Sequence, residues 1–262
     1  MRAAYTTFGY YVTLGLFGAF GLGLSLLALL AGLMRDTDRT ERSFQRLIHL
    51  NFRLFLAWTS FARLFHARFH GTARLAAERQ GLIVAANHPS LVDATLLLAC
   101  LPEALCIFKP AIRRNPVLGA AARRAGYLPN DGGHDGLRRV ADKVATGHAL
   151  VVFPEGTRTP PGEALGPLRA GFVVIARRAG VPIQLVHIAY TLPVLGKAHP
   201  WWKPQPLPST ADVRVGPRFR IAPDASTAAV TAWIEAWWRD PAGFPAAACA
   251  ASAGVMLLTD AS

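Results

Sequence analysis

The first long apolar run of the chain predicts a membrane-spanning helix. Residues 8–34 contain no charged side chain, and a helix of this length, at about 1.5 Å per residue, exceeds the roughly 30 Å hydrocarbon core of a bilayer. A secretory signal peptide is the competing interpretation, but its apolar region is usually only about 7–15 residues long, and no clear A-x-A cleavage site follows the run. We therefore predict a membrane anchor over residues 1–42.

The side chains that flank this run predict its orientation. Only Arg2 precedes it, whereas the arginines that follow are Arg35, Arg39, Arg42 and Arg46. The tyrosines suited to the membrane interface are Tyr5, Tyr10 and Tyr11. By the positive-inside rule, the bulk of the chain is expected on the cytoplasmic face of the inner (cytoplasmic) membrane, held by a single span.

The next segment, residues 43–70, has the spacing of one amphipathic helix. Its apolar side chains recur at helical intervals and include Phe44, Ile48, Phe55, Phe65 and Phe69, and its basic face carries Arg46, Arg53 and Arg68. Such a helix can lie along an anionic leaflet. Its apolar face can equally be ordinary core for the domain that follows, and both uses can hold for different stretches.

From about Gly71 the pattern changes to short apolar runs separated by helical segments. Strands are predicted at 82–86, 105–108, 149–153 and 183–189, and helices at about 136–146 and 170–179. Glycines suited to left-handed helix caps follow both helices, and a last helix can be capped by Ser226. This alternation predicts an α/β fold, a mixed β-sheet flanked by helices, in a domain spanning 71–240. Residues 241–262 are expected to form an alanine-rich, weakly apolar tail, either disordered or packed, without an assigned function.

Composition narrows the class of partner. The net charge is +12 with 52% hydrophobic residues, so an anionic partner is expected, either nucleic acid or acidic lipid headgroups. The chain shows no recognised nucleic-acid-binding motif, and its apolar run favours a membrane, so we predict an anionic membrane surface and no nucleic acid. The cysteines Cys100, Cys106 and Cys249 are odd in number and form no CxxC pair. Neither a disulfide framework nor a metal site is therefore predicted.

The strongest candidate chemistry follows the predicted strand at 82–86. His88 and Asp93 lie in the loop after this strand, where open α/β sheets usually place their sites. A neutral imidazole can accept a proton from a hydroxyl, and a carboxylate on its other nitrogen stabilises the imidazolium. Ser90 and Asp93 also fit an S-x-x-D capping box, which would give Asp93 a structural role. The two roles are compatible, because the same helix start would hold Asp93 beneath His88.

A second group of polar residues follows the predicted strand at 149–153. It consists of Glu155, Gly156, Thr157 and Arg158, and backbone donors together with a guanidinium suit a phosphate. A solvated turn with a surface arginine is the alternative. Lys109, which follows the strand at 105–108, is a further candidate for substrate binding if these segments converge.

The motifs NHPSLVD, FKPAIRRNPVLG, FPEGTR and AGVPIQLV, in this order, resemble the four sequence blocks of the glycerolipid acyltransferases, including 1-acylglycerol-3-phosphate acyltransferases. The resemblance covers roughly residues 71–221, and LGPLRAG at 165–171 matches the stretch after the third block. It implies that His88 is the general base, that Asp93 is its partner, and that Glu155 to Arg158 help bind the polar head of the acceptor. The family associates its fourth block, here Val181 to Ile183, with substrate binding or packing. We interpret these residues as structural in the first place.

One position departs from the family pattern. The second block typically ends like FIDR, with an arginine thought to contact the acceptor phosphate, whereas this chain has Asn130 after Tyr127, Leu128 and Pro129. A neutral amide cannot form a bidentate ionic contact. Either Lys109, Arg113 or Arg114 replaces the arginine, or the acceptor is not a phosphate monoester.

The resemblance predicts transfer of a fatty acyl group from an acyl carrier protein or coenzyme A thioester to the hydroxyl of a lysophospholipid-like acceptor, without a cofactor. Backbone donors near the site are expected to stabilise the oxyanion. Three alternatives are open: a non-glycerol acceptor such as an aminolipid, a thioesterase in which His88 activates water, and a basic membrane scaffold without chemistry.

Overall fold

The computed structural model describes residues 2–33, 37–76, 81–130 and 133–258. The strands of this part form one sheet in the order β1-β7-β6-β2-β5-β3-β4, with β8 added beside β7. Pairing with β7 is antiparallel for β6 and β8 and parallel for β1. The sheet is therefore mixed, as predicted. Its strands are β1 (Phe65–His70), β2 (Leu82–Ala86), β3 (Ala104–Phe108), β4 (Leu128–Pro129), β5 (Ala149–Val152), β6 (Ile183–Tyr190), β7 (Ser209–Ile221) and β8 (Val255–Leu257).

All four apolar runs that predict strands form strands, and they lie next to one another in the middle of the sheet. In β2, Ile83 and Ala85 pack into the core on one face of the sheet, while Leu82, Val84 and Ala86 pack on the other. Both faces of these strands are buried, which explains why their sequences are continuously apolar rather than alternating.

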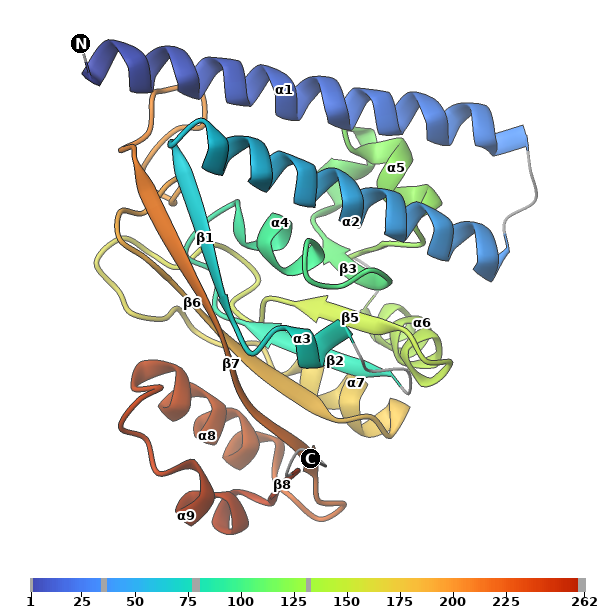
Figure 1. Ribbon diagram of the computed structural model, residues 1–262. Coiled ribbons are helices and arrows are strands. Elements are labelled where there is room, and N and C mark those ends of the chain that lie inside the picture. The colour runs from blue at the N-terminus through green and yellow to red at the C-terminus, as the bar shows by residue number, and fades with distance from the viewer. Residues whose placement is uncertain (1, 34–36, 77–80, 131–132, 259–262) are drawn as a thin grey trace.

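Helices cover both faces of this sheet (Figure 1). The core cluster on one face includes residues of α6, α7 and α8, and the cluster on the other face includes residues of α2 and α4. The helices are α1 (Arg2–Leu30), η1 (Ala31–Leu33), α2 (Asp38–Phe61), α3 (Ala73–Ala76), α4 (Asp93–Leu98), η2 (Pro110–Arg114), α5 (Gly119–Arg124), α6 (Gly133–Ala145), α7 (Gly171–Ala179), α8 (Thr227–Arg239), α9 (Ala246–Ala250) and η3 (Ala251–Ala253). The helices predicted at 136–146 and 170–179 correspond to α6 and α7, and Gly180 caps α7 in the left-handed region with φ 65°.

The N-terminal helix α1 is long and apolar enough to cross a bilayer, judged by its length and composition. Its predicted end, with Met34 and Arg35, lies outside the described residues. Polar contacts join α1 to the rest of the chain: the Tyr5 hydroxyl donates to the Ala62 carbonyl at 2.7 Å, and the Ser25 hydroxyl donates to the Val117 carbonyl at 2.8 Å. The helix therefore lies alongside α2 and α5 (Figure 1).

The single amphipathic helix predicted at 43–70 is wrong at both ends. Helix α2 already begins at Asp38, where Thr37 forms a capping box, and it ends at Phe61. Arg63 then adopts a positive φ of 51°, a conformation that ends a right-handed helix. Residues 65–70 form strand β1, parallel to β7. Phe65 and Phe69 have helical spacing by coincidence, because pairing with a distant strand overrides the local pattern.

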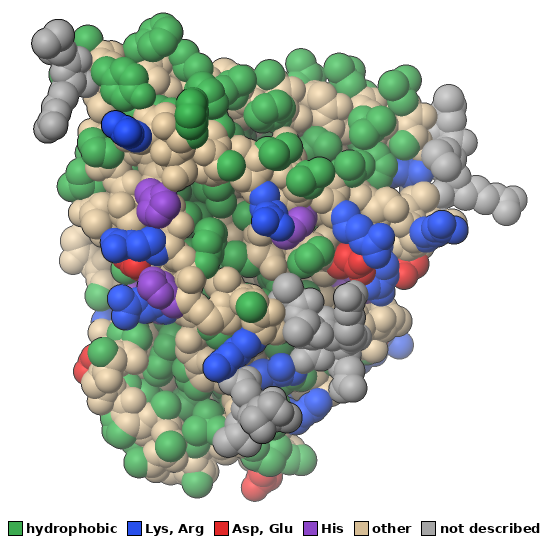
Figure 2. Space-filling model, in the orientation of Figure 1, with side chains coloured by type: hydrophobic (Ala, Val, Ile, Leu, Met, Phe, Trp, Pro, Cys, Tyr) green, Lys and Arg blue, Asp and Glu red, His purple; other side chains and the backbone are tan. Residues whose placement is uncertain are grey.

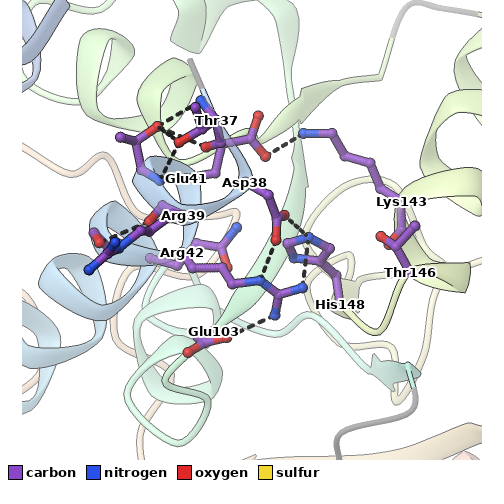
Figure 3. A network of polar contacts seen from close by, with 12 residues as sticks. Thr37, Asp38, Arg39, Glu41, Arg42, Glu103, Lys143, Thr146 and His148 are labelled. Carbon is purple, nitrogen blue, oxygen red and sulfur yellow. Dashed lines mark hydrogen bonds and ion pairs between the residues drawn. The ribbon is translucent and has the colours of Figure 1, made fainter. Parts of the chain in front are cut away.

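A polar network joins the N-terminal end of α2 to residues near β3, α6 and β5 (Figure 3). Arg42 donates to Asp38 and to Glu103, both at 2.8 Å. Asp38 also lies 2.8 Å from Nε2 of His148, which follows α6, and Lys143 pairs with Glu41 at 2.6 Å. Burial lowers the pKa of His148.

Of the two alternatives for the C-terminal segment, its described part is packed, and it lies against the sheet. Residues 241–258 contain α9, η3 and β8, and β8 extends the sheet through antiparallel pairing with β7. Ala250, Ala253 and Val255 are buried in the core. Ser226 stands at the N-cap position of α8, as predicted, but its side chain makes no capping hydrogen bond.

Candidate active site

His88 lies two residues beyond the end of β2. The preceding residue, Asn87, is buried and joins this loop to β6, because its side chain donates to the Ile188 carbonyl at 2.9 Å and accepts from the Ile188 N–H at 2.8 Å. Nδ1 of His88 lies 2.8 Å from Oδ2 of Asp93. The imidazole also stacks on Phe153, with ring centroids 4.2 Å apart. The ring is thus held on one edge and one face, and Nε2 is the nitrogen that remains to take a proton.

Asp93 is the first residue of α4 and is fully buried. Besides His88, its carboxylate accepts from the Ser90 N–H at 2.8 Å and from the Tyr190 hydroxyl at 2.5 Å. Burial raises the pKa of Asp93, whereas the hydrogen bonds from His88, Tyr190 and Ser90 favour its charged form. Burial also raises the pKa of Tyr190 well above its usual value, and the Asp93 charge adds to this rise. Tyr190 therefore stays a neutral donor.

The capping-box interpretation of Asp93 holds in part. Its carboxylate accepts from the Ser90 N–H, which is the reciprocal half of such a box, but the Ser90 hydroxyl accepts from Val92 N–H at 3.0 Å instead of from Asp93. The N-cap residue of α4 is Val92. One Asp93 oxygen thus contacts both the helix start and His88, so the structural role leaves the contact with His88 intact.

Glu155 is buried and its carboxylate is fully occupied by donors from the chain. Oε1 accepts from the His88 N–H at 2.7 Å and from the Thr159 hydroxyl at 3.0 Å, and Oε2 accepts from the Gly166 N–H at 2.8 Å. Thr159 N–H also donates to the His88 carbonyl at 2.8 Å. This arrangement makes Glu155 a residue that positions His88, and its carboxylate faces the chain rather than a ligand.

The other residues of the PEGTR motif differ in whether they line the main cavity. Gly156 lines the main cavity, with a positive φ of 65°. Arg158 instead donates through Nη1 to the carbonyls of Leu195 and Gly196, at 2.9 and 2.8 Å. Neither Arg158 nor Thr157 is among the cavity-lining residues.

A cavity of about 460 Å³ opens beside His88. Its walls come from α1, α2, α4, α5, the ends of β3 and β5, and α7, and they are mostly apolar. The apolar residues that line it include Phe17, Leu24, Phe52, Leu98, Val117, Ala122 and Phe172. Part of the hydrophobic face of α2 thus lines a cavity. The sequence pattern suggested only membrane contact or domain core for this face.

Polar side chains besides His88 also line this cavity. Lys109, Asn130 and Arg169 all line it and are exposed, whereas Arg113 and Arg114 are exposed on η2 without lining it. Of the three basic residues considered as replacements for an arginine at position 130, Lys109 therefore shares the cavity. Sequence reasoning missed Arg169, although the stretch LGPLRAG that contains it was noted, and it missed Tyr190, for which no local signal exists.

Comparison with known proteins shows which class of protein this domain resembles. The family model described as Acyltransferase matches residues 66–189, a range that contains His88, Asp93, Glu155 and Lys109. This segment is thus similar to the acyltransferase family. The fold agrees, because the structure resembles the crystal structure of the 1-acyl-sn-glycerophosphate acyltransferase PlsC from Thermotoga maritima with a TM-score of 0.70, at 22% identity over 92% of this chain and 97% of that one.

The names of individual relatives state different acceptor lipids. A lyso-ornithine lipid O-acyltransferase of Pseudomonas aeruginosa is 35% identical over 176 residues, which is 66% of this chain and 64% of that protein. The chloroplastic 1-acyl-sn-glycerol-3-phosphate acyltransferase BAT2 of Brassica napus is 30% identical over 62% of this chain and 46% of that protein. The match thus spans about half to nearly two thirds of these curated relatives.

Proposed function

We propose that this protein transfers a fatty acyl group from a thioester to the hydroxyl of a lysolipid, with His88 as general base. One observation carries the proposal: His88, oriented by a buried Asp93 at 2.8 Å, lines an apolar cavity of about 460 Å³. A base at the wall of a largely apolar cavity suits a substrate that pairs a reactive hydroxyl or ester with a hydrocarbon chain.

The chemistry follows from the hydrogen bonds of the imidazole. Nδ1–H donates to Asp93, so Nε2 accepts the proton as the acceptor oxygen attacks the thioester carbon. The tetrahedral intermediate then expels the thiolate, which takes the proton from His88, and the products are an ester and a free thiol. Stabilisation of the oxyanion by backbone donors stays a prediction, and the N–H groups of His88 and Ser90 are not the donors, because Glu155 and Asp93 engage them.

The apolar part of the cavity suits an acyl chain. Its wall includes Phe17 and Leu24 of α1 and Phe52 of α2, so the helices that carry the membrane-facing side chains also enclose the proposed chain. Each buried methylene contributes about 0.8 kcal/mol to binding.

The thioester belongs to an acyl carrier protein or coenzyme A, and both are anionic partners suited to the exposed Arg113 and Arg114.

We further propose an amino-acid lipid of the lyso-ornithine type as acceptor. The name of the Pseudomonas aeruginosa relative supports this choice, and so does Asn130, which lines the cavity where an arginine for a phosphate monoester is typical. Lys109 and Arg169 share that cavity and suit a single carboxylate. A 1-acylglycerol 3-phosphate is the second candidate, supported by the names of other relatives.

The protein is proposed to act at the cytoplasmic face of the inner membrane, attached through α1. The side chains that α1 exposes are large and apolar, among them Phe8 at 70% and Leu30 at 71% exposure, and apolar side chains cover this part of the surface (Figure 2). Hydrogen bonds from Tyr5 to Ala62 and from Ser25 to Val117 hold α1 against the rest of the domain. We therefore favour a helix that lies along one leaflet over the single span expected from the sequence.

The orientation of α1 is testable with one cysteine. Ala4 is exposed near the start of α1, and a Cys residue there would reach the outer side of the membrane only if the helix spans it. With A4C in intact cells, a membrane-impermeant maleimide should label the protein only after the cells are opened. Labelling of intact cells would establish the spanning arrangement instead.

The enzymatic test uses the purified full chain in lipid vesicles with a radiolabelled acyl thioester. Acyl transfer should depend on an added lysolipid and favour lyso-ornithine lipid over 1-acylglycerol 3-phosphate with either donor. His88→Ala should lower the rate by about 10²- to 10⁴-fold, the usual contribution of general base catalysis. Release of free acid independent of lysolipid would establish a thioesterase, and an unaffected rate in H88A would exclude His88 as the base.

A further inference from the structure

The loop that joins β6 to β7 exposes two adjacent indoles. Trp201 and Trp202 are 53% and 58% exposed, and their rings pack edge to face with centroids 5.9 Å apart. Exposed basic residues flank them, Lys197 and Lys203. Neighbouring exposed tryptophans between lysines are unusual on a surface that meets only water, because a large apolar side chain gains free energy when it leaves water.

This loop, which we call the Trp loop (residues 193–205), is braced from within. Gln205 is buried, accepts from the Leu195 N–H at 2.9 Å, and donates to the carbonyls of Pro200 and Lys203 at 3.1 and 2.8 Å. The two indoles are therefore presented by a loop with a defined shape. Their exposure is not the result of a loosely held segment.

The Trp loop is continuous with the N-terminal end of α1. The hydroxyl of Tyr10 donates to the Trp201 carbonyl, and the hydroxyl of Tyr11 donates to the Trp202 carbonyl at 3.3 Å. Helix α1 exposes further aromatic side chains at this end, including Phe8. The indoles and the apolar surface of α1 thus form parts of one surface.

The same loop also contacts the segments that carry the catalytic residues. The Ser90 hydroxyl donates to the Val194 carbonyl at 2.6 Å, and the Leu91 N–H donates to the Leu195 carbonyl at 3.3 Å. Arg158 donates to the Leu195 carbonyl at 2.9 Å. Leu195 has a positive φ of 53°, which a leucine adopts only where its surroundings hold it.

From these contacts we infer that the Trp loop is a second membrane-contact element, which inserts Trp201 and Trp202 into the headgroup region of an anionic bilayer. Tryptophan favours this region because its ring is apolar and its N–H is polar, and lysines beside it attract anionic lipid. Through Ser90 and Arg158, the loop sets the height of His88 above the bilayer, where a lysolipid hydroxyl arrives. The inference rests on the proposed transfer to a membrane lipid.

A second copy of the chain is the competing occupant of this surface. The chain has a net charge of +12. Contact between two identical copies around Lys197 and Lys203 is therefore unfavourable, because like charges repel. An anionic bilayer has the opposite charge. The observations therefore favour lipid, and the oligomeric state serves as an outcome of the test.

The location of the indoles is tested by fluorescence quenching with the full chain in phosphatidylglycerol-containing vesicles that carry brominated lipid. Wild-type protein should show a quenched fraction that W201F/W202F loses. The matched control is W238F, which removes an indole that is 2% exposed on α8 and should leave that fraction intact. An unchanged quenched fraction in W201F/W202F would overturn the inference, as would conversion of a dimer to a monomer by this substitution with quenching retained.

The functional consequence is tested with acceptors in two physical states. W201S/W202S should raise the KM for vesicle-borne lysolipid about tenfold, with little change for a dissolved short-chain acceptor. M256S is the matched control, because Met256 is 47% exposed on β8, far from α1 (Figure 1). Equal effects on both acceptors would assign the indoles a folding role only. Failure of the wild type to acylate either acceptor would instead refute the proposed function.

Discussion

The backbone N–H of His88 donates to the buried carboxylate of Glu155 at 2.7 Å, across 67 positions of sequence. This contact joins the loop after β2 to the loop after β5, two neighbouring parallel strands. Glu155, the acidic residue of the PEGTR motif, therefore holds His88 in place through its backbone N–H.

Glu155→Gln should lower both stability and kcat. A glutamine offers one acceptor oxygen to three donors, so its amide N–H faces another donor in a buried place, at a cost of about 1–3 kcal/mol. Urea unfolding and initial rates measure the two effects. Glu163→Gln is the matched control because Glu163 is exposed; E155Q with the stability and kcat of E163Q would contradict the positioning role.

Tyr190→Phe should shift the acidic limb of the pH–rate profile to higher pH. The Tyr190 hydroxyl donates to Asp93 and lowers the pKa of that carboxyl, so its loss raises the pKa of Asp93 further, and protonation begins at a higher pH. A shift of about one unit would correspond to about 1.4 kcal/mol. The profile of kcat/KM measures it, with Tyr5→Phe as control. A uniform fall in rate without a shift would argue against this electrostatic role.

His148→Gln should flatten the dependence of stability on pH between about 5 and 7. Burial lowers the pKa of His148 in the folded chain, so the unfolded chain binds the extra proton first. Stability that is present above the unfolded pKa of about 6.5 is then lost as the pH falls toward the folded pKa. Urea unfolding at several pH values measures the slope. His134→Gln, at an exposed position, should keep the wild-type slope, and an equal slope in H148Q would exclude His148 as its source.

Leu24→Trp should shorten the acyl chains that the enzyme accepts. Leu24 of α1 lines the cavity, and each methylene excluded from it removes about 0.8 kcal/mol of binding, about fourfold in affinity. Competition between short-chain and long-chain acyl thioesters measures the preference. Leu26→Trp is the control, since Leu26 is 53% exposed and does not line the cavity. The same preference in L24W and L26W would place the chain elsewhere.

Asn130→Arg should increase the use of 1-acylglycerol 3-phosphate relative to lyso-ornithine lipid. Asn130 lines the cavity beside His88, and an arginine there supplies the bidentate phosphate contact that an amide lacks. The expected change in the ratio of kcat/KM values is about tenfold, corresponding to 1.4 kcal/mol. Ser252→Arg adds the same charge at an exposed position. If both variants change the ratio equally, the effect comes from total charge.

The features that were predictable from sequence are those encoded within a few residues. The apolar runs of β2, β3, β5 and β6 are continuous because both faces of these strands are buried, and such runs are visible without any partner. The His88 and Asp93 pair was predictable because five positions separate the two residues across one loop and helix start. The family resemblance added the PEGTR motif to the same site.

Tertiary structure alone decided the rest, because the decisive contacts join residues far apart in the chain. Glu155 meets His88 and Tyr190 meets Asp93 only after β2, β5 and β6 lie side by side. Residues 65–70 have helical spacing, yet they form a strand because β7 offers its edge. The cavity exists only where α1 and α2 cover the sheet. The sequence by itself determined the candidate base, His88, and the strand before it. Packing determined which residues hold His88 in place and which enclose the cavity beside it.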